Sequence, residues 1–186
     1  EEFMGDRKRA LEEEFFRQRE RALLERLRGE HARQTARQAL ASASGISDDV
    51  VLTRLVELGI EPDTLLALRL VPLIEVAWAD GRLDDRERQA VLSGLETAGL
   101  KPGSAAYAIV QGWLASPPPA SVLDAWTSYT SALCARLAPG ERANLRASVM
   151  GQARAVAEAA GGFLGVGRIS QAEEEMLRRL EQAFGA

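Results

Sequence analysis

Three carboxylates of the sequence, Asp80, Asp84 and Glu87, lie close together in a short polar stretch. Carboxylate oxygens are the ligands that hard divalent cations such as Ca²⁺ prefer. The same oxygens also accept hydrogen bonds from the free backbone N–H groups at the start of a helix. The three residues therefore predict one of two kinds of chemistry, a weak divalent-cation site or a polar turn that caps a helix.

The spacing supports the cation site only in part. Asp80-Gly81, an apolar residue two positions on and Glu87 copy the second half of an EF-hand calcium loop. The first half is missing, because Val76 and Trp78 stand where Asp or Asn would be needed. Since Ca²⁺ takes about six to eight oxygen ligands, three carboxylates with nearby backbone carbonyls form a marginal ligand set.

The capping interpretation uses the same residues as structure. A helix ends before Asp80, Gly81 turns the chain, and Asp84 followed three residues later by Glu87 forms a capping box. Leu83 then anchors the turn in the core as a hydrophobic staple. Asp80 faces the negative end of a helix dipole, so it should either accept hydrogen bonds from the following turn or hold a cation. The sequence leaves both interpretations open.

The segments around this turn predict an all-α fold, because no convincing two-residue alternation of apolar and polar residues appears. Capping residues and glycines predict the helix ends. The run from Leu65 to Ala79 is apolar nearly all round, which marks the buried centre, and Pro72 should break or kink it. We expect helices at about 6–41, 47–58 (capped by Ser47), 84–98, 104–115, 120–137, 140–160 and 170–184, with Pro139-Gly140 separating two of them.

A weaker copy of the capped turn follows later in the chain. Residues 167–173 repeat the Gly, Arg, apolar residue and Glu of residues 81–87 at the same spacing. Ser170 replaces Asp84 as the cap, and Val166 replaces Asp80, so the second copy should bind no cation. The pattern suggests two helix–turn–helix units packed face to face after an internal duplication, although good capping boxes also look alike.

On these residues the sequence resembles the TerB-like family, the helical domain of tellurite-resistance proteins and of some membrane-anchored co-chaperones. The family's hallmark is an apolar helix ending in Ala-Asp-Gly, then a short turn and a Glu that opens the next helix. Residues Ala77 to Glu87 match it closely, and Glu173 matches a second, looser element. The resemblance spans roughly residues 47–184. It implies a compact multi-helix fold, no established catalytic activity, a scaffold or stress-response role, and divalent-cation binding near this turn in some members.

The first part of the chain differs from the rest in charge. Residues 6–40 carry a net charge of +3, whereas residues 41–186 carry −5. The first part lacks proline and is rich in good helix formers, so we expect one long helix about 50 Å in length. A small domain cannot cover all of such a helix, which we call the arm.

The arm carries a narrow apolar stripe with no sustained heptad, which argues against a long coiled coil. We expect Phe15, Phe16, Leu23 and Leu27 to contact a protein partner by helix-in-groove docking. Two alternatives stay open. The arms of two copies could pair in a homodimer, or the stripe could lie on its own domain.

The beginning of the arm also resembles the zeta-type inhibitor of bacterial ATP synthase. The residues that carry this resemblance are Asp6-Arg7-Lys8-Arg9-Ala10-Leu11-Glu12, Phe15 and Glu20. In that family the helix enters the rotary catalytic head and blocks hydrolysis. The resemblance implies an alternative function, a regulator whose arm inhibits an ATPase, but the rest of the chain does not match that family.

Composition argues against several function classes. One Cys and one His argue against a disulfide framework and the usual Cys/His zinc sites. A net charge of −4 argues against nucleic-acid binding. His31 is expected on the surface and Cys134 in the core. Residues 161–167 are rich in glycine but lack the Lys of a phosphate-binding loop. We therefore expect a non-enzymatic protein with no cofactor beyond the possible divalent cation.

The expected organisation has three parts: a cloning scar at 1–3 before Met4, the arm at 4–44 and a TerB-like domain at 45–186. No apolar run reaches the length of a transmembrane helix. A lone Cys in a helical pattern fits a reduced cytoplasmic location. Together these features predict a cytoplasmic helical interaction or scaffold protein.

Overall fold

The computed structural model describes residues 2–160 and 168–185. Those residues form helices joined by short connections, with no strand among them, which confirms the all-α prediction. The elements are α1 (Glu2–Ser44), α2 (Asp49–Glu57), η1 (Pro62–Thr64), α3 (Leu65–Leu68), α4 (Val71–Ala77), α5 (Asp85–Thr97), α6 (Ala105–Ala115), α7 (Ala120–Cys134), α8 (Pro139–Ala160) and α9 (Gln171–Gln182).

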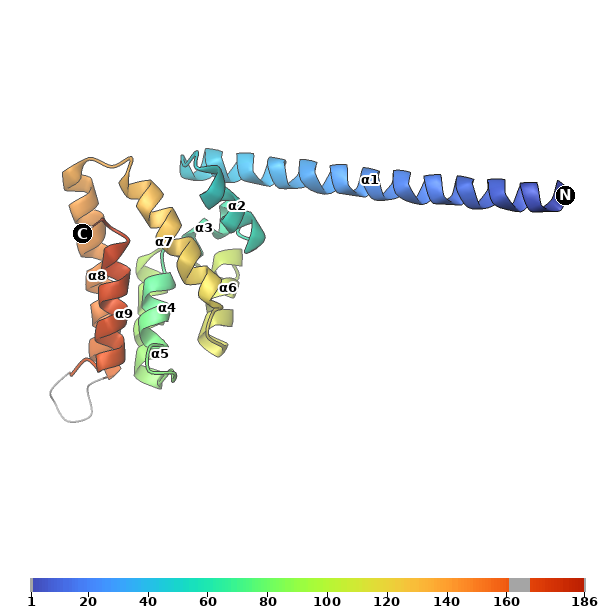
Figure 1. Cartoon of the computed structure of the whole chain (residues 1–186). Helices are drawn as coiled ribbons and strands as arrows, with labels where there is room; N and C mark the ends of the chain where they lie inside the picture. Colours follow the sequence, from blue (N-terminus) through green and yellow to red (C-terminus); the bar gives the residue numbers. More distant parts are fainter. Residues whose placement is uncertain (1, 161–167, 186) are drawn as a thin grey trace.

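Helix α1 projects from one end of the domain formed by the other helices (Figure 1). Only its C-terminal end packs on that domain, against α2 and η1. Leu40, in this last part, is 1% exposed and belongs to the core. Gly45 ends the helix with φ +70, a left-handed conformation that glycine adopts without strain. The long helix that we predicted is therefore present and extends to Ser44.

The apolar run around Pro72 forms the centre of the domain, as predicted. Pro72 breaks the run into α3 and α4 and lies in the first turn of α4, where a missing N–H costs nothing. Most of α4 is fully buried, because α5, α7, α8 and α9 all pack on it. The packing is tight at Gly94 of α5, where a Cβ atom would lie 2.5 Å from a methyl carbon of Leu73.

The hairpins α4–α5 and α8–α9 pack on each other. Helix α5 begins with the capping box of Asp84 and Glu87, and α9 begins with that of Ser170 and Glu173. This arrangement agrees with two similar units packed face to face.

Three predicted helix ends are wrong in detail. Asp48, not Ser47, caps α2, since its side chain accepts the backbone N–H groups of Val50 and Val51. Helix α7 ends at Cys134, before the predicted 137. Pro139 and Gly140 form the first turn of α8 rather than a separator, because proline fits that position. The glycine-rich segment 161–167 lies outside the described residues.

Candidate functional site: the capped turn and the exposed arm

The turn between α4 and α5 is held by its own carboxylates. Asp80 is exposed and accepts the backbone N–H of Arg82 at 2.9 Å. Asp84 accepts the N–H groups of Arg86 and Glu87, each at 2.8 Å. Glu87 reaches back to the N–H of Asp84 at 2.8 Å. The capping interpretation is therefore confirmed, including the hydrogen bond expected for Asp80.

Burial separates Glu87 from its two neighbours. Its side chain is 4% exposed, while Asp80 and Asp84 lie on the surface. Burial raises the pKa of Glu87 from 4.5 to about 7, and the charges of Asp84, Asp80 and Glu173 add to the increase. The backbone hydrogen bond at Asp84 opposes it. Glu173, the matching residue of the second capping box, is also 4% exposed.

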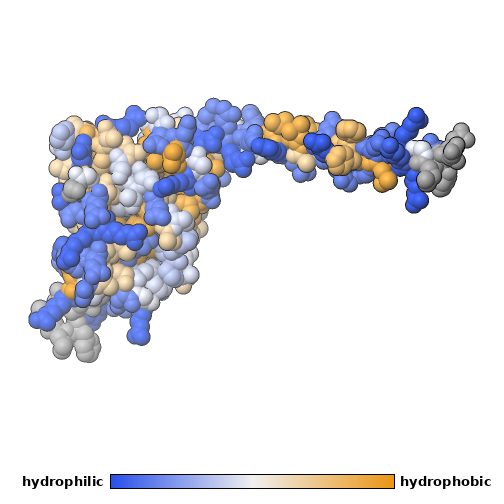
Figure 2. All heavy atoms as spheres, in the orientation of Figure 1, coloured by the Kyte–Doolittle hydropathy of each residue, from blue (hydrophilic) through white to orange (hydrophobic). Residues whose placement is uncertain are grey.

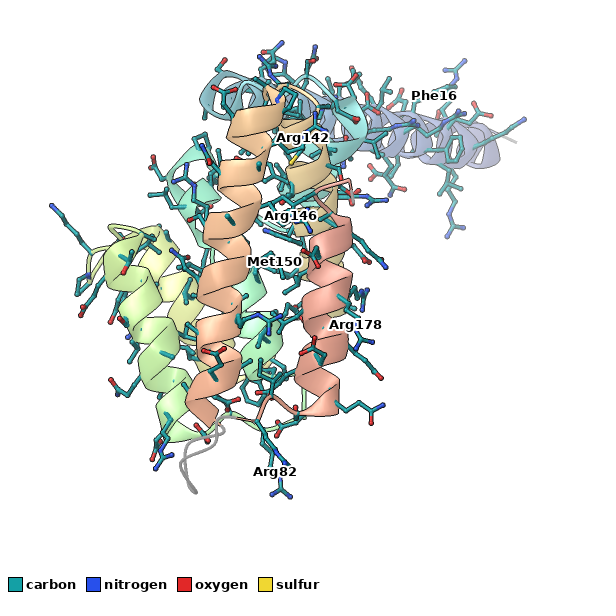
Figure 3. The ribbon with its side chains drawn as sticks, turned by 90° about the vertical axis from the view of Figure 1, so that its left-hand side faces the viewer. Phe16, Arg82, Arg142, Arg146, Met150 and Arg178 are labelled. Atoms are coloured by element: carbon teal, nitrogen blue, oxygen red, sulfur yellow. The ribbon has the colours of Figure 1, made fainter. Side chains whose placement is uncertain are left out.

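The three carboxylates do not form a ready cation site. Within residues 2–160 and 168–185, no group of three or more His, Cys, Asp or Glu side chains gathers in a way that could hold a metal ion. Each of Asp80, Asp84 and Glu87 accepts a backbone hydrogen bond instead. Arg82, between them, points away from the domain (Figure 3). The weak divalent site stays a prediction from the sequence.

We expect Asp84→Ala to lower the free energy of unfolding by about 1–2 kcal/mol, because two N–H groups of α5 lose their acceptor. The loss should be the same with and without millimolar Ca²⁺, Mg²⁺ or Zn²⁺, measured by urea unfolding. Asp85→Ala, one residue on, is the matched control, since Asp85 accepts no capping bond in the described structure. A cation that stabilises the wild type but not Asp84→Ala would contradict the purely structural turn.

The arm presents its apolar side chains to solvent. Phe15 is 56% exposed, Phe16 66%, Leu23 55% and Leu27 51%. Figure 2 shows hydrophobic patches on the surface of an otherwise polar arm that projects from the domain. Figure 3 places Phe16 far from α8 and α9. The alternative in which the stripe lies on its own domain is therefore wrong.

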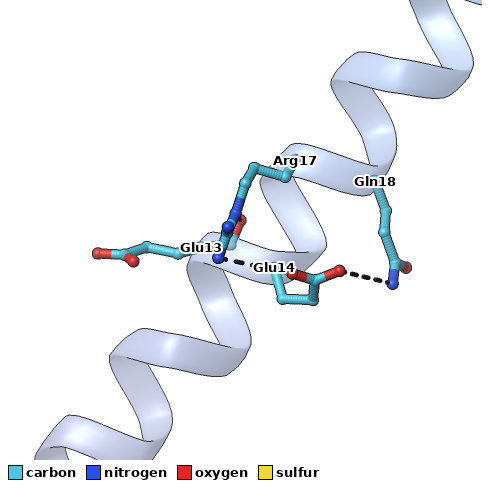
Figure 4. A network of polar contacts seen from close by, with 4 residues as sticks. All are labelled: Glu13, Glu14, Arg17 and Gln18. Atoms are coloured by element: carbon cyan, nitrogen blue, oxygen red, sulfur yellow. Dashed lines mark hydrogen bonds and ion pairs between the residues drawn. The ribbon is translucent and has the colours of Figure 1, made fainter.

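Local polar contacts hold the exposed helix. Arg17 lies 3.5 Å from the carboxylate of Glu14, and Gln18 donates to the same carboxylate at 3.3 Å (Figure 4). Arg26 and Glu30 form a similar pair at 3.2 Å. Such exposed pairs each contribute only about 0.2–0.5 kcal/mol. These pairs do not involve Phe15 and Phe16, which stay exposed with their ring centres 6.2 Å apart. The guanidinium of Arg19 lies over the Phe15 ring, 5.6 Å from its centre.

The remaining candidate residues have structural surroundings. His31 is exposed. Cys134 is buried as a free thiol, and burial raises its pKa. Trp126 is 2% exposed, and Trp78 donates from its ring N–H to the backbone oxygen of Trp113 at 2.8 Å. The positions of His31 and Cys134 agree with those predicted from the sequence.

Sequence reasoning did not single out Glu75 of α4. One of its carboxylate oxygens is buried and has no hydrogen-bond partner among the described residues. Burial raises its pKa from 4.5 to about 7; Arg179 opposes the increase and Asp124 adds to it. In the sequence, Glu75 could have been recognised as a charged residue within the most apolar run of the chain.

Residues 64–186 match the family of tellurite resistance protein TerB. The chain belongs to the TerB family. The match covers well over half of the chain and includes both capping boxes, whereas the arm lies outside it. No curated protein and no solved structure matches the chain, so the resemblance of the arm to an ATP synthase inhibitor gains no support. No helix in the described part of this TerB protein is long and apolar enough to cross a membrane.

Proposed function

We propose that this TerB protein is a non-catalytic interaction protein whose helical arm binds in a groove on a protein partner. The observation that carries the proposal is the exposure of large apolar side chains on a helix anchored at only one end. Isolated apolar residues on a surface are ordinary, but Phe15, Phe16, Leu23 and Leu27 recur along one projecting element. We add to this proposal a role in stress resistance, which rests on the family's description alone.

The exposed apolar residues lie on two sides of the arm helix. Leu11 and Phe15 are four residues apart and share one side of the helix, while Phe16, Leu23 and Leu27 share another. This distribution supports a partner that surrounds part of the helix, which is the geometry of a groove. The arm's net positive charge favours a groove with an acidic rim.

The test compares two double variants in the full chain. Phe16→Ser with Leu23→Ser removes apolar contacts, and Gln34→Ser with Gln38→Ser changes two exposed polar residues of the same helix. Proteins captured from a host extract are identified by mass spectrometry, and each is then purified and titrated against the three chains. We expect the apolar variant to bind at least about 30-fold more weakly, since two buried anchors contribute more than about 2 kcal/mol.

Self-association is measured on the same samples by light scattering at several concentrations. A dimer that disappears only in the apolar variant would identify a second copy as the arm's partner. A purified partner that binds both variants equally, or that binds a chain lacking residues 4–36, would contradict the proposal. ATP synthase subunits among the arm-dependent partners would favour the inhibitor alternative.

A further inference from the structure

A cavity of about 450 Å³ lies between α7 and α8. The two helices diverge from their connection at residues 135–138 (Figure 1), and the end of α5 and the residues after α3 close the space between them. Cavities that hold small molecules typically measure about 300–1,000 Å³. The space is therefore large enough for a small organic ligand.

The inner wall of the cavity is apolar. Trp126 and Phe184 line it, are 2% and 3% exposed, and pack edge to face with their ring centres 6.0 Å apart. Leu133 of α7 and Val149 of α8 line the sides. The apolar body of a ligand would thus be removed from water and would contact rigid aromatic and aliphatic groups.

The polar groups of the cavity favour a negative charge on the ligand. Arg69 is the only charged side chain among the described residues that line it, although the domain as a whole is acidic. Arg69 forms no ion pair within the described part of the chain. Its charge acts on the phenol of Tyr129, whose pKa burial raises and Arg69 partly lowers. Both groups can donate hydrogen bonds to one carboxylate.

We propose that this cavity binds a small organic acid, with its aliphatic or aromatic body against Trp126 and Phe184 and its carboxylate at Arg69 and Tyr129. The proposal is independent of the arm, because no residue of α1 lines the cavity.

Calorimetric titration of the full chain with octanoate and 1-octanol tests the proposal. The two probes share an eight-carbon body and differ in charge. We expect octanoate to bind one site per chain with a Kd below about 1 mM, and 1-octanol to bind at least fivefold more weakly. Arg69→Met should weaken octanoate about tenfold and leave 1-octanol unchanged, because one charge-assisted contact is lost.

Two variants of α8 show whether binding occurs in the cavity. Ser148 is exposed and lines the cavity, so Ser148→Trp should block both probes. Ala147→Trp places the same side chain on an exposed position of α8 that does not line it, and should bind as the wild type does. Circular dichroism confirms that both variants are folded. Absence of saturable octanoate binding at about 5 mM, binding that survives Ser148→Trp, or binding lost only in Phe15→Ser with Phe16→Ser would each overturn the proposal.

Discussion

Replacing Glu75 and Glu87 together by glutamine should stabilise the protein at pH 8 by about 2–4 kcal/mol and leave it almost unchanged near pH 4.5. Both carboxyl groups have a pKa of about 7 in the folded protein, against an ordinary value of 4.5, and burial is the main cause in each case. Glutamine keeps a similar shape and an acceptor oxygen for the capping hydrogen bond of Glu87. It removes the cost of a buried negative charge.

The sign of the pH dependence follows from proton binding. An acid whose folded pKa is raised binds its proton more tightly in the folded than in the unfolded state. The two protonated carboxyl groups therefore contribute fully to the stability of the folded wild type below about pH 4.5, and this contribution is lost as the pH rises through the folded pKa of about 7. Above pH 7 the loss from these two groups is complete. The double variant should show a flatter stability profile across this window.

Urea unfolding at half-unit steps between pH 4.5 and 8 measures the effect. Glu158→Gln, an exposed position of α8, is the matched control and should keep the wild-type profile. The single variants separate the two sites, and they should add nearly independently if Glu75 and Glu87 do not interact. An unchanged pH slope in the double variant would show that neither carboxyl group binds its proton more tightly on folding.

Local signals in the sequence were sufficient for much of the fold. The capping boxes at Asp84 and Ser170 could be predicted because each involves residues only three positions apart. The error at Ser47 arose because two adjacent residues can both cap a helix, and only the backbone geometry decides that Asp48 does so. Pro72 marked the break between α3 and α4 because its ring excludes a helix interior.

The candidate sites depended on contacts between distant segments, which the sequence could not supply. Whether the apolar residues of the arm were exposed depended on the direction in which α1 leaves the domain. The cavity depends on the divergence of α7 and α8 over Trp126, and no short motif encodes that angle. Glu75 and Arg69 could be recognised in the sequence as charges within an apolar run. Only the packing of the helices determines that the carboxylate of Glu75 is buried and that Arg69 lines the cavity.

Leucine-to-alanine substitutions at two positions of α1 should show where the arm becomes part of the domain. Leu40 is 1% exposed, so Leu40→Ala should lower the free energy of unfolding by about 2–4 kcal/mol through lost burial and a cavity. Leu23 is 55% exposed, so Leu23→Ala should change it by less than about 0.5 kcal/mol. Both are measured by urea unfolding. Equal losses would mean that the exposed half of α1 also packs on the domain or on a second copy.

The same contrast links the stability of the arm to its proposed use. The exposed part of α1 is held by backbone hydrogen bonds and a few surface pairs, whereas the part near Leu40 packs on α2 and η1. Amide hydrogens before about residue 34 should therefore exchange quickly in the free protein, and those around Leu40 slowly. A bound partner must order the arm, and this ordering costs part of the partner's affinity. Substitution of Phe16 and Leu23 should therefore weaken binding of the partner and leave the free energy of unfolding unchanged. This separation lets one set of variants test the arm's function without disturbing the TerB domain.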